Sequence, residues 1–408
     1  MTQTFSGVES RDWGGHAKGS PEYRRVLLAL ACAGVATFAQ LYSPQGILPE
    51  ISDSLRVGAD QSALLISVAT LGLAAAVLPW SVVADRIGRL PAMRYSLIAA
   101  TVFGLAVTLC PNFTGLLVLR ALEGAALGGL PAIAMTYLQE EIAPSHTAVA
   151  AGTYISGTTV GGLLGRLVAA PVTGWIDWRW GVGVVVALSA SAAAAFMVLT
   201  PRPRGFVRTA RADRRPLSRV LWLNLRSPAM LALYLQGFLL MGGFVTVYNY
   251  LSFRLKAPPF LLPSSLIAFL FLAYLAGTWS SRRAGAIAGT RGRLPVLLTA
   301  IVIMIVGVLI TLVDSLPVII VGLVILTVGF FGAHSIASGW SAARATVGRA
   351  QAASMYNLFY YGGSSVVGWA AGLVFTRYGW DATALVVVAL AVVAGACAAT
   401  ALRSPRRS

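Results

Sequence analysis

The hydrophobic residues of this chain are grouped in twelve long runs separated by short polar segments. Each run covers 18 to 25 residues, and a helix needs about 20 mostly apolar residues to cross a bilayer. The runs lack the strict alternation that marks the strands of a membrane barrel, so helices are the elements that satisfy the backbone in lipid. We predict an all-α integral membrane protein with transmembrane helices over residues 26–49, 61–83, 93–110, 114–138, 148–170, 181–200, 229–251, 263–280, 295–313, 317–341, 351–374 and 381–402.

The second and third runs are joined by a short charged connection. It contains Asp85, Arg86, Gly88 and Arg89, and a charge at the bilayer centre costs at least about 2.5–3.5 kcal/mol, so the connection marks a membrane surface. Gly88 permits a tight turn, and Asp85 can pair with either arginine. We interpret these four residues as a gating loop, with a generic basic loop as the alternative.

Short sequences recur in the second half of the chain at a nearly constant offset. Gly88-Arg89-Leu90-Pro91 returns as Gly292-Arg293-Leu294-Pro295, 204 residues later. Weaker echoes of residues 157–162 and 148–151 have offsets of 206 and 202. Three near-equal offsets in order indicate a tandem duplication, and two halves related by an axis along the membrane normal are a recurrent transporter architecture. The sequence thus predicts two pseudo-symmetric six-helix bundles.

Composition and charge agree with a membrane protein. With 57% hydrophobic and 11% charged residues, the chain fits no soluble globular class. Of its 31 basic residues, 24 fall on the side of both termini and five on the other side, with Arg120 and Arg166 inside runs. This bias predicts that both termini are cytoplasmic. The net charge of +17 is spread over many short loops, which favours anionic lipid headgroups over nucleic acid as the partner.

Polar segments at the ends and in the middle define the predicted domains. Residues 1–22 lack the apolar core and cleavage site of a signal peptide and are predicted to be a disordered cytoplasmic tail. Residues 201–228 are rich in Pro and Arg, and we interpret them as a basic cytoplasmic linker. The N-terminal bundle then covers residues 23–200, the C-terminal bundle covers 229–402, and 403–408 form a basic cytoplasmic tail.

Charges inside the runs are few and are therefore candidates for the mechanism. Glu123 is the one acidic residue well inside a run, and Arg120 precedes it by three residues on the same helical face. Arg166 is expected at a similar depth. Our hypothesis is a proton-coupling cluster in which the Glu123 carboxylate alternates between pairing with an arginine and binding a proton. Substrate binding competes for the same arginines. The alternative is a permanent ion pair that anchors the fourth helix.

Three glycines recur every fourth residue in the fifth run. Gly157, Gly161 and Gly165 form a smooth ridge on which another helix can pack closely. A phosphate-binding loop is excluded, because the segment lies mid-run and lacks both the lysine and the preceding strand.

Polar and aromatic residues inside the runs are candidates for a substrate site near the midplane. Each is equally consistent with a hydrogen bond between helices. His334 is singled out as a second proton-coupling candidate, because an unperturbed imidazole titrates near neutral pH. The predicted substrate-binding residues are Gln40, Tyr42, Gln45, Tyr234, Gln236, Tyr248, Asn249, His334, Asn357 and Tyr361.

The cysteines and histidines show no metal-binding pattern. Cys32, Cys110 and Cys397 lie in or beside apolar runs, and the three histidines are far apart in sequence. We expect no metal and no cofactor, and we expect the protein to work as a monomer with a small-molecule substrate and protons.

Several motifs resemble those of the major facilitator superfamily. Ser81-x-x-x-Asp85-Arg86-x-Gly88-Arg89 is similar to its loop motif, and Arg120-Ala-Leu-Glu123-Gly124 is similar to its Arg-x-x-Gln-Gly signature. Residues 157–162 resemble the antiporter motif, with Thr158 in place of proline. Pro44–Pro49 resembles a motif of the twelve-span drug and sugar efflux group, and segments of the second half resemble its YnfM-like subgroup.

The resemblance implies a major facilitator fold and alternating access between the two bundles, usually driven by proton antiport. We expect a secondary transporter that exports a drug-like compound, sugar, organic acid or siderophore-like compound across the bacterial inner membrane. A proton-coupled importer of the same fold is the nearest alternative. A lipid-acting membrane enzyme is a further one, with Glu140, Glu141 and His146 as candidates, and a channel is disfavoured because a continuous pore does not explain the repeat.

Overall fold

The computed structural model describes residues 13–206 and 217–402. Within these ranges the chain is almost entirely helical and contains no β-strand. The elements are α1 (Pro21–Tyr42), η1 (Ser43–Ile47), α2 (Leu48–Leu55), α3 (Ala59–Ile87), α4 (Arg89–Leu109), α5 (Phe113–Leu127), α6 (Gly129–Glu141), η2 (Pro144–His146), α7 (Thr147–Trp175), α8 (Trp178–Leu199), α9 (Leu217–Arg226), α10 (Pro228–Lys256), α11 (Ser264–Ala268), η4 (Phe269–Ala273), α12 (Tyr274–Arg291), α13 (Arg293–Ile310), α14 (Leu316–Arg344) and α15 (Arg349–Ala401).

Eleven helical segments of the described chain are long and apolar enough to cross a membrane. The last of them belongs to α15, a helix of 53 residues that is interrupted at Gly379, where φ is 74° and ψ is −164°. This conformation is readily open to glycine alone, and it turns the chain back so that α15 supplies two crossings. The prediction of twelve transmembrane helices is confirmed, with ends that agree to within a few residues except at α12, which continues well past residue 280 to Arg291.

The two most similar segments of the repeat have the same backbone conformation. Gly88 ends α3 and begins α4 with φ of 101°, and Gly292 ends α12 and begins α13 with φ of 84°. Both values lie in the region that favours glycine, which explains why the tight turn recurs with the Gly-Arg-Leu-Pro sequence.

The first crossing is broken near its far end. Residues Ser43–Ile47 form the 3-10 turn η1 between α1 and α2, and all five are buried. Pro44 and Pro49 supply no backbone N–H, so a regular helix cannot run through this stretch. The break places Gln45 inside the protein rather than on a continuous helical face.

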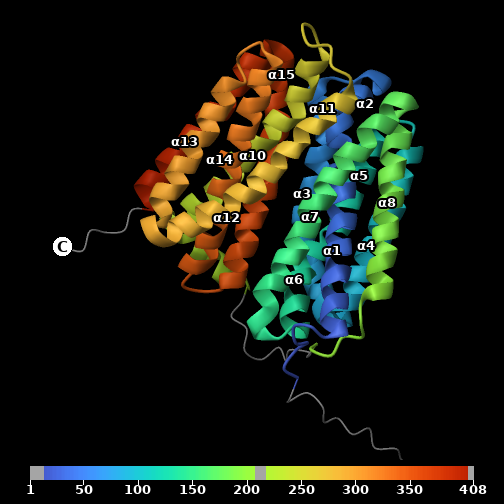
Figure 1. Cartoon of the computed structure of the whole chain (residues 1–408), viewed down its shortest axis with the longest axis vertical. Helices are drawn as coiled ribbons and strands as arrows, with labels where there is room; N and C mark the ends of the chain where they lie inside the picture. Colours follow the sequence, from blue (N-terminus) through green and yellow to red (C-terminus); the bar gives the residue numbers. More distant parts are fainter. Residues whose placement is uncertain (1–12, 207–216, 403–408) are drawn as a thin grey trace, which may run out of the picture.

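The helices form two bundles that follow the halves of the sequence. α1 packs on α7 and α8 in the first half, while α10 packs on α15 and α13 on α14 in the second. Figure 1 shows the first half in blue to green beside the second half in yellow to red. α3 also packs on α15 and joins the two bundles.

The bundles meet closely at one end of the molecule. We call the side where α1 begins and α8 ends the terminal side, and the side with α2 and α11 the distal side. At the distal side Lys256 Nζ lies 3.1 Å from Glu50 and 3.0 Å from Asp53, and Ser264 donates to Glu50. The ribbons in Figure 1 are close together at this upper end and farther apart at the lower, terminal side.

The segments outside the bundles differ from the expected tail and linker. Residues 1–12, 207–216 and 403–408 lie outside the described residues. From Trp13 onward, however, the expected tail has defined contacts: His16 N–H donates to Glu141 O at 2.8 Å, and α1 already begins at Pro21. The backbone pairing of His16 with the end of α6 is a long-range contact that local sequence patterns do not reveal.

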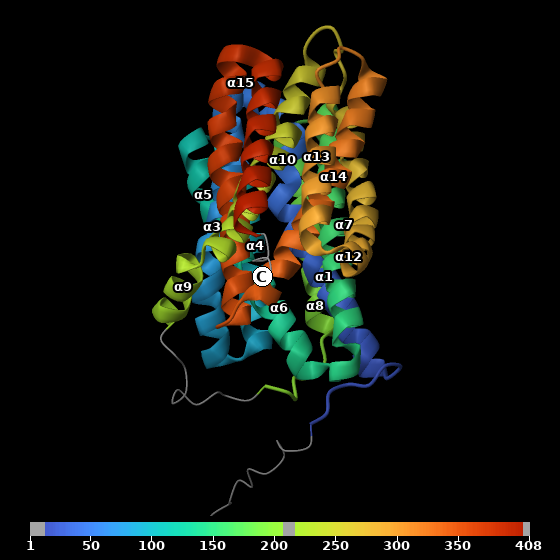
Figure 2. The same cartoon turned by 90° about the vertical axis from the view of Figure 1, so that its left-hand side faces the viewer.

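The end of the expected linker is also ordered, as helix α9. This helix packs on α10 and α15 and lies at the edge of the molecule in Figure 2. Asn224 Nδ2 donates to Val347 O at 3.2 Å, while Trp222 is exposed. One face of α9 therefore contacts the second bundle, and Trp222 lies on an exposed face.

Candidate functional site

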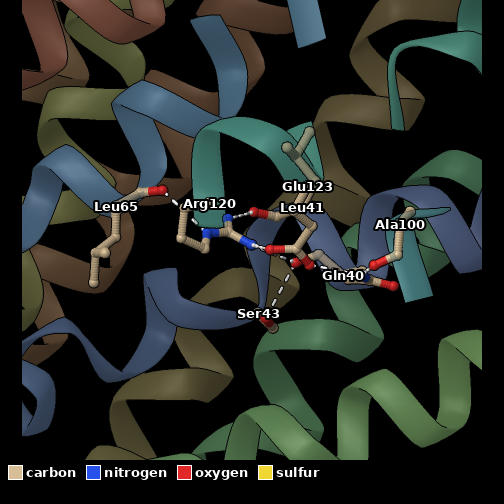
Figure 3. Close-up of polar contacts among 7 residues, drawn as sticks. All are labelled: Gln40, Leu41, Ser43, Leu65, Ala100, Arg120 and Glu123. Carbon is tan, nitrogen blue, oxygen red and sulfur yellow. Dashed lines mark hydrogen bonds and ion pairs between the residues drawn. The ribbon is translucent and has the colours of Figure 1, made fainter. Parts of the chain in front are cut away.

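The central feature of the first bundle is a buried ion pair between two residues of α5. Arg120 Nη1 lies 2.6 Å from Glu123 Oε2, and each side chain is 1% exposed. Gln40 of α1 donates from Nε2 to Glu123 Oε1 at 2.6 Å, which gives the carboxylate a second partner (Figure 3). α5 packs mainly on α3 and α4, and Arg120 and Glu123 extend from it to Gln40 of α1.

The remaining donors of Arg120 are used on main-chain oxygens. Nη2 donates to Leu41 O at 2.6 Å and Nε donates to Leu65 O at 3.2 Å, so the guanidinium joins α5 to α1 and α3. Burying two charges costs several kcal/mol per ion unless close pairing and further hydrogen bonds offset the loss of water. The arrangement meets both conditions, so it can hold a charged carboxylate inside the membrane.

Arg166 of α7 forms a separate group. Its Nε donates to Gln45 Oε1 at 2.9 Å, Nη2 donates to the same oxygen, and Nη1 donates to Gly162 O at 2.5 Å. The rings of Tyr42, Phe271 and Tyr274 lie 4.4, 4.7 and 5.0 Å from the guanidinium carbon. A desolvated cation over an aromatic ring gains about 2 kcal/mol, so the three rings partly replace a counter-ion.

The expected cluster of Glu123 with both arginines is therefore divided in two. Glu123 pairs with Arg120 and Gln40, whereas Arg166 has Gln45 as its side-chain partner. Gln45 lies in the η1 break beside α7. Its amide oxygen, and not a carboxylate, accepts the hydrogen bonds of the Arg166 guanidinium. This pairing of Arg166 with Gln45 was not predicted, because the break redirects the side chains that follow Tyr42.

A hydrogen bond from Gln45 crosses between the bundles. Its Nε2 donates to Asn249 Oδ1 of α10 at 2.7 Å, and Gln45 and Asn249 are 0% and 1% exposed. A second such bond joins the hydroxyls of Thr70 and Ser365 at 2.8 Å. Gln45 and Asn249, both predicted for the substrate site, thus lie in the contact between the halves.

Other predicted substrate residues face the inside of the second bundle. Gln236 donates to Ala394 O at 2.9 Å, Tyr234 stacks on Phe359, and Tyr248 shares a 2.8 Å hydrogen bond with Thr327. These contacts resemble ordinary packing between helices.

The remaining predicted residues lie on α14 and α15. His334 Nδ1 is 2.9 Å from the Tyr356 hydroxyl and its ring lies 4.7 Å from that of Tyr360. Tyr361 is buried, with its ring against Tyr360, whereas Asn357 is exposed. In the described chain no carboxylate lies within 4.0 Å of His334, so the structure places this residue in an aromatic setting apart from Glu123.

Several residues of these groups were not predicted from the sequence. Phe271 and Tyr274 contact Arg166, Thr327 pairs with Tyr248, and Tyr356 pairs with His334. The spacing of Phe271 and Tyr274 by three residues was a usable signal, since it places both rings on one helical face.

The charged loop is tied to the end of α6. Arg89 Nη1 lies 2.6 Å from Asp85 Oδ1, and Arg89 Nε lies 3.0 Å from Glu140 Oε1. The neighbouring Glu141 accepts from the backbone N–H groups of Arg204 and Gly205, both at 2.8 Å. Glu140 and Glu141 thus hold loop and linker segments together, and His146 packs instead against the ring of Tyr23. Within the described residues no group of three His, Cys, Asp or Glu side chains can hold a metal ion.

The three predicted packing glycines lie against α1. A β-carbon built on Gly157, Gly161 or Gly165 would lie 2.5, 2.6 or 2.3 Å from the carbonyl oxygen of Ala31, Val35 or Ala39. The backbones of α1 and α7 are thus in direct contact. Because Gly165 lies against Ala39, the neighbouring residues Arg166 and Gln40 lie at the same level of the two helices.

Comparison with known proteins identifies the family. The profile described as Major Facilitator Superfamily matches residues 30–347, which is most of the chain. The chain belongs to the Major Facilitator Superfamily. It is 39% identical over 381 residues to the inner membrane transport protein YnfM of Escherichia coli (strain K12), covering 92% of this chain and 90% of that protein. It is 36% identical to the uncharacterized MFS-type transporter YybF of Bacillus subtilis (strain 168), covering 89% and 90% of the two chains.

Solved structures of the superfamily have the same fold. A bacterial homologue of the human lysosomal transporter Spinster, in an inward-facing and occupied conformation, aligns with a TM-score of 0.76 at 18% identity, covering 95% of this chain and 98% of that one. The nucleoside transporter NupG aligns with a TM-score of 0.73 at 14% identity, covering 93% and 100%. The protein is thus a multi-pass membrane transporter with the major facilitator fold, as the motifs predicted.

Proposed function

We propose that this transporter exports a small organic compound in exchange for protons, with Glu123 as the proton carrier. The observation that supports the proposal is the burial of the Glu123 carboxylate between Arg120 and Gln40. Of the described carboxylates only Glu123 and Glu141 are buried, and Glu141 lies at the end of α6. Glu123 is therefore the acid best placed to carry a proton between the two faces.

The exchange follows from the two partners of the carboxylate. With Arg120 in place, Glu123 is stabilised as an anion, and when the guanidinium moves away the buried carboxyl group takes up a proton. Arg120 also donates to Leu41 O and Leu65 O. A relative movement of α1 and α3 therefore changes the position of the guanidinium and the strength of its pairing with Glu123. Proton binding and helix movement are coupled in this way.

The orientation rests on the distribution of basic residues. With 24 of 31 on the terminal side, that side faces the cytoplasm and the distal side faces outward. The bundles are joined at the distal side by Lys256, Glu50 and Asp53, so we assign the structure to a state closed to the outside. The similarity to the inner membrane transport protein YnfM of Escherichia coli supports a location in the inner membrane.

The test is proton movement in sealed proteoliposomes under an inward-directed pH gradient, with a panel of candidate compounds. Coupled flux in the wild type that is lost in Glu123→Gln supports the proposal. Asp381→Asn is the control, because Asp381 is exposed and its loss should leave the flux unchanged. Flux that survives in Glu123→Gln but is lost in His334→Gln would move the carrier to α14. Import of a compound together with protons would favour the importer instead.

A further inference from the structure

The group around Arg166 has more hydrogen-bond donors than acceptors. Gln45 Oε1 accepts from Arg166, which turns Gln45 Nε2 toward Asn249 Oδ1. Asn249 Nδ2 then remains, and this buried donor has no hydrogen-bond partner among the described residues. The chain of hydrogen bonds runs in one direction, from the guanidinium to an amide N–H that lacks an acceptor. A buried polar atom left unpaired is unfavourable, so the group as a whole is suited to a ligand that brings acceptors.

The charge of this group is also unbalanced. Arg166 is 2% exposed, and among the described residues no carboxylate oxygen lies within 4.0 Å of its guanidinium nitrogens. The neighbouring Arg120 is neutralised by Glu123. One positive charge therefore remains inside the membrane domain, held by neutral oxygens and aromatic rings, and an anion is the ligand that it favours.

A second unpaired group lies close to Asn249. Ser67 Oγ is buried and lacks a partner within residues 13–206 and 217–402, and it lies beside Gly368, as Asn249 does. A β-carbon at Gly368 would be 3.7 Å from Asn249 Nδ2 and 4.0 Å from Ser67 Oγ. Two unpaired donors from different bundles thus flank one backbone position of α15.

The two bundles share this group between them. Arg166, Gln45 and Tyr42 belong to the first bundle, whereas Asn249, Phe271 and Tyr274 belong to the second. A separation of the bundles at the distal side would break the Gln45–Asn249 bond and take two of the three rings away from Arg166.

We propose that Arg166 and Asn249 bind the carboxylate of a small aromatic organic anion and that such anions are the substrate class of this transporter. The guanidinium supplies the charge, Asn249 Nδ2 supplies a further donor, and Tyr42, Phe271 and Tyr274 stack against the aromatic part. In this structure Gln45 Oε1 accepts from the guanidinium, and a substrate carboxylate that enters from the terminal side would displace it. This inference rests on the proposed transport function but adds the chemistry of the ligand.

The experiment measures ligand binding to the full chain purified in detergent, without a pH gradient. The probes are hippurate, 3-phenyllactate and indole-3-acetate, each paired with its neutral amide at equal ionic strength, and the readout is the midpoint of thermal unfolding. At least one carboxylate should raise the midpoint of the wild type while its amide does not. The half-saturating concentration should rise at least tenfold in Arg166→Gln and less in Arg166→Lys, and Arg291→Gln should behave like the wild type.

Two further results decide the proposal if a variant is unstable. Should Arg166→Gln fail to fold, Asn249→Leu is used, and it should weaken carboxylate binding several-fold. Equal effects of acid and amide, unchanged binding in both variants, or no response of the wild type to any of the three carboxylates would overturn the inference. Because this assay needs no proton coupling, its failure leaves the flux measurement on Glu123 independent.

Discussion

Gln45 and Asn249 are hydrogen-bonded across the two bundles and are 204 residues apart in sequence. This separation equals the offset at which Gly88-Arg89-Leu90-Pro91 is repeated. The two amides therefore share the register of this sequence repeat, and they meet where the halves contact. The contact links the duplication seen in the sequence to the interface at which alternating access takes place.

The two members of this pair should differ in their effect on stability. Gln45→Leu removes the side-chain acceptor of Arg166 and leaves a buried cation short of partners, which should cost about 2–3 kcal/mol. Asn249→Leu removes one acceptor but also a donor that is already unpaired, so its cost should be smaller. Thermal unfolding in detergent tests the order, and an equal or larger loss in Asn249→Leu would contradict it.

The buried pair of α5 offers a test that separates stability from coupling. Arg120→Met alone leaves Glu123 uncompensated and should cost about 3–5 kcal/mol. The double variant Arg120→Met with Glu123→Leu should recover a large part of that loss, because no lone charge remains. If the pair were only an anchor, the double variant would also keep proton-coupled transport, and we expect that it does not. Unfolding midpoints and flux are measured on the same preparations.

The glycines of α7 can be compared with a glycine of the same helix that has free space. Gly165→Ala places a β-carbon 2.3 Å from Ala39 O, so α1 and α7 must move apart at a cost of about 1–3 kcal/mol. A β-carbon at Gly152 meets nothing within 4 Å. Gly152→Ala should therefore be neutral or stabilising by about 0.5–1 kcal/mol. Similar unfolding midpoints for the two variants would refute the close-packing account.

Arg89 should be more important for stability than other basic residues of the terminal side. Arg89→Gln leaves Asp85 and Glu140 without the cation that both contact, and the expected loss is about 2 kcal/mol. The matched control is Arg291→Gln, since Arg291 precedes the repeated turn and is exposed. The midpoints of both variants are compared with the wild type, and no difference between them would argue against the network.

Glu141 should protect the start of the linker. Its Oε1 atom holds the N–H groups of Arg204 and Gly205, so Glu141→Ala should make the chain after Arg204 several-fold more susceptible to trypsin. Glu141→Gln keeps an acceptor oxygen and should be cleaved more slowly than the alanine variant. Mass analysis of timed digests identifies the cut, and equal rates for both variants would show that the contact has no protective effect.

The helices and their pairing into halves could be predicted from sequence because lipid imposes a simple rule on length and polarity. Glu123 and Arg120 were predicted as partners because residues three apart share a helical face, and the structure pairs them at 2.6 Å. The roles assigned to them in transport stay predictions.

The partners of Arg166 could not be predicted in the same way. They depend on the break at Ser43–Ile47, which turns Gln45 toward α7, and on rings from η4 and α12 of the other bundle. Contacts that combine an irregular segment with residues about 100 or more positions away leave no periodic signal. The same holds for His16 and Glu141, which meet by backbone pairing between the N-terminal segment and the end of α6.

The Gln45–Asn249 contact joins two different side chains, which two identical subunits could not place opposite each other on their symmetry axis. In a dimer of two identical six-helix subunits, residues on the two-fold axis would face their own copies, and both would have to carry the same side chain. Joining the halves in one chain removes this restriction. A glutamine and an asparagine can then stand opposite each other, and a cation can lie behind one of them alone. The hydrogen bonds gain a fixed direction from the first half to the second, which no symmetric pair of subunits can have.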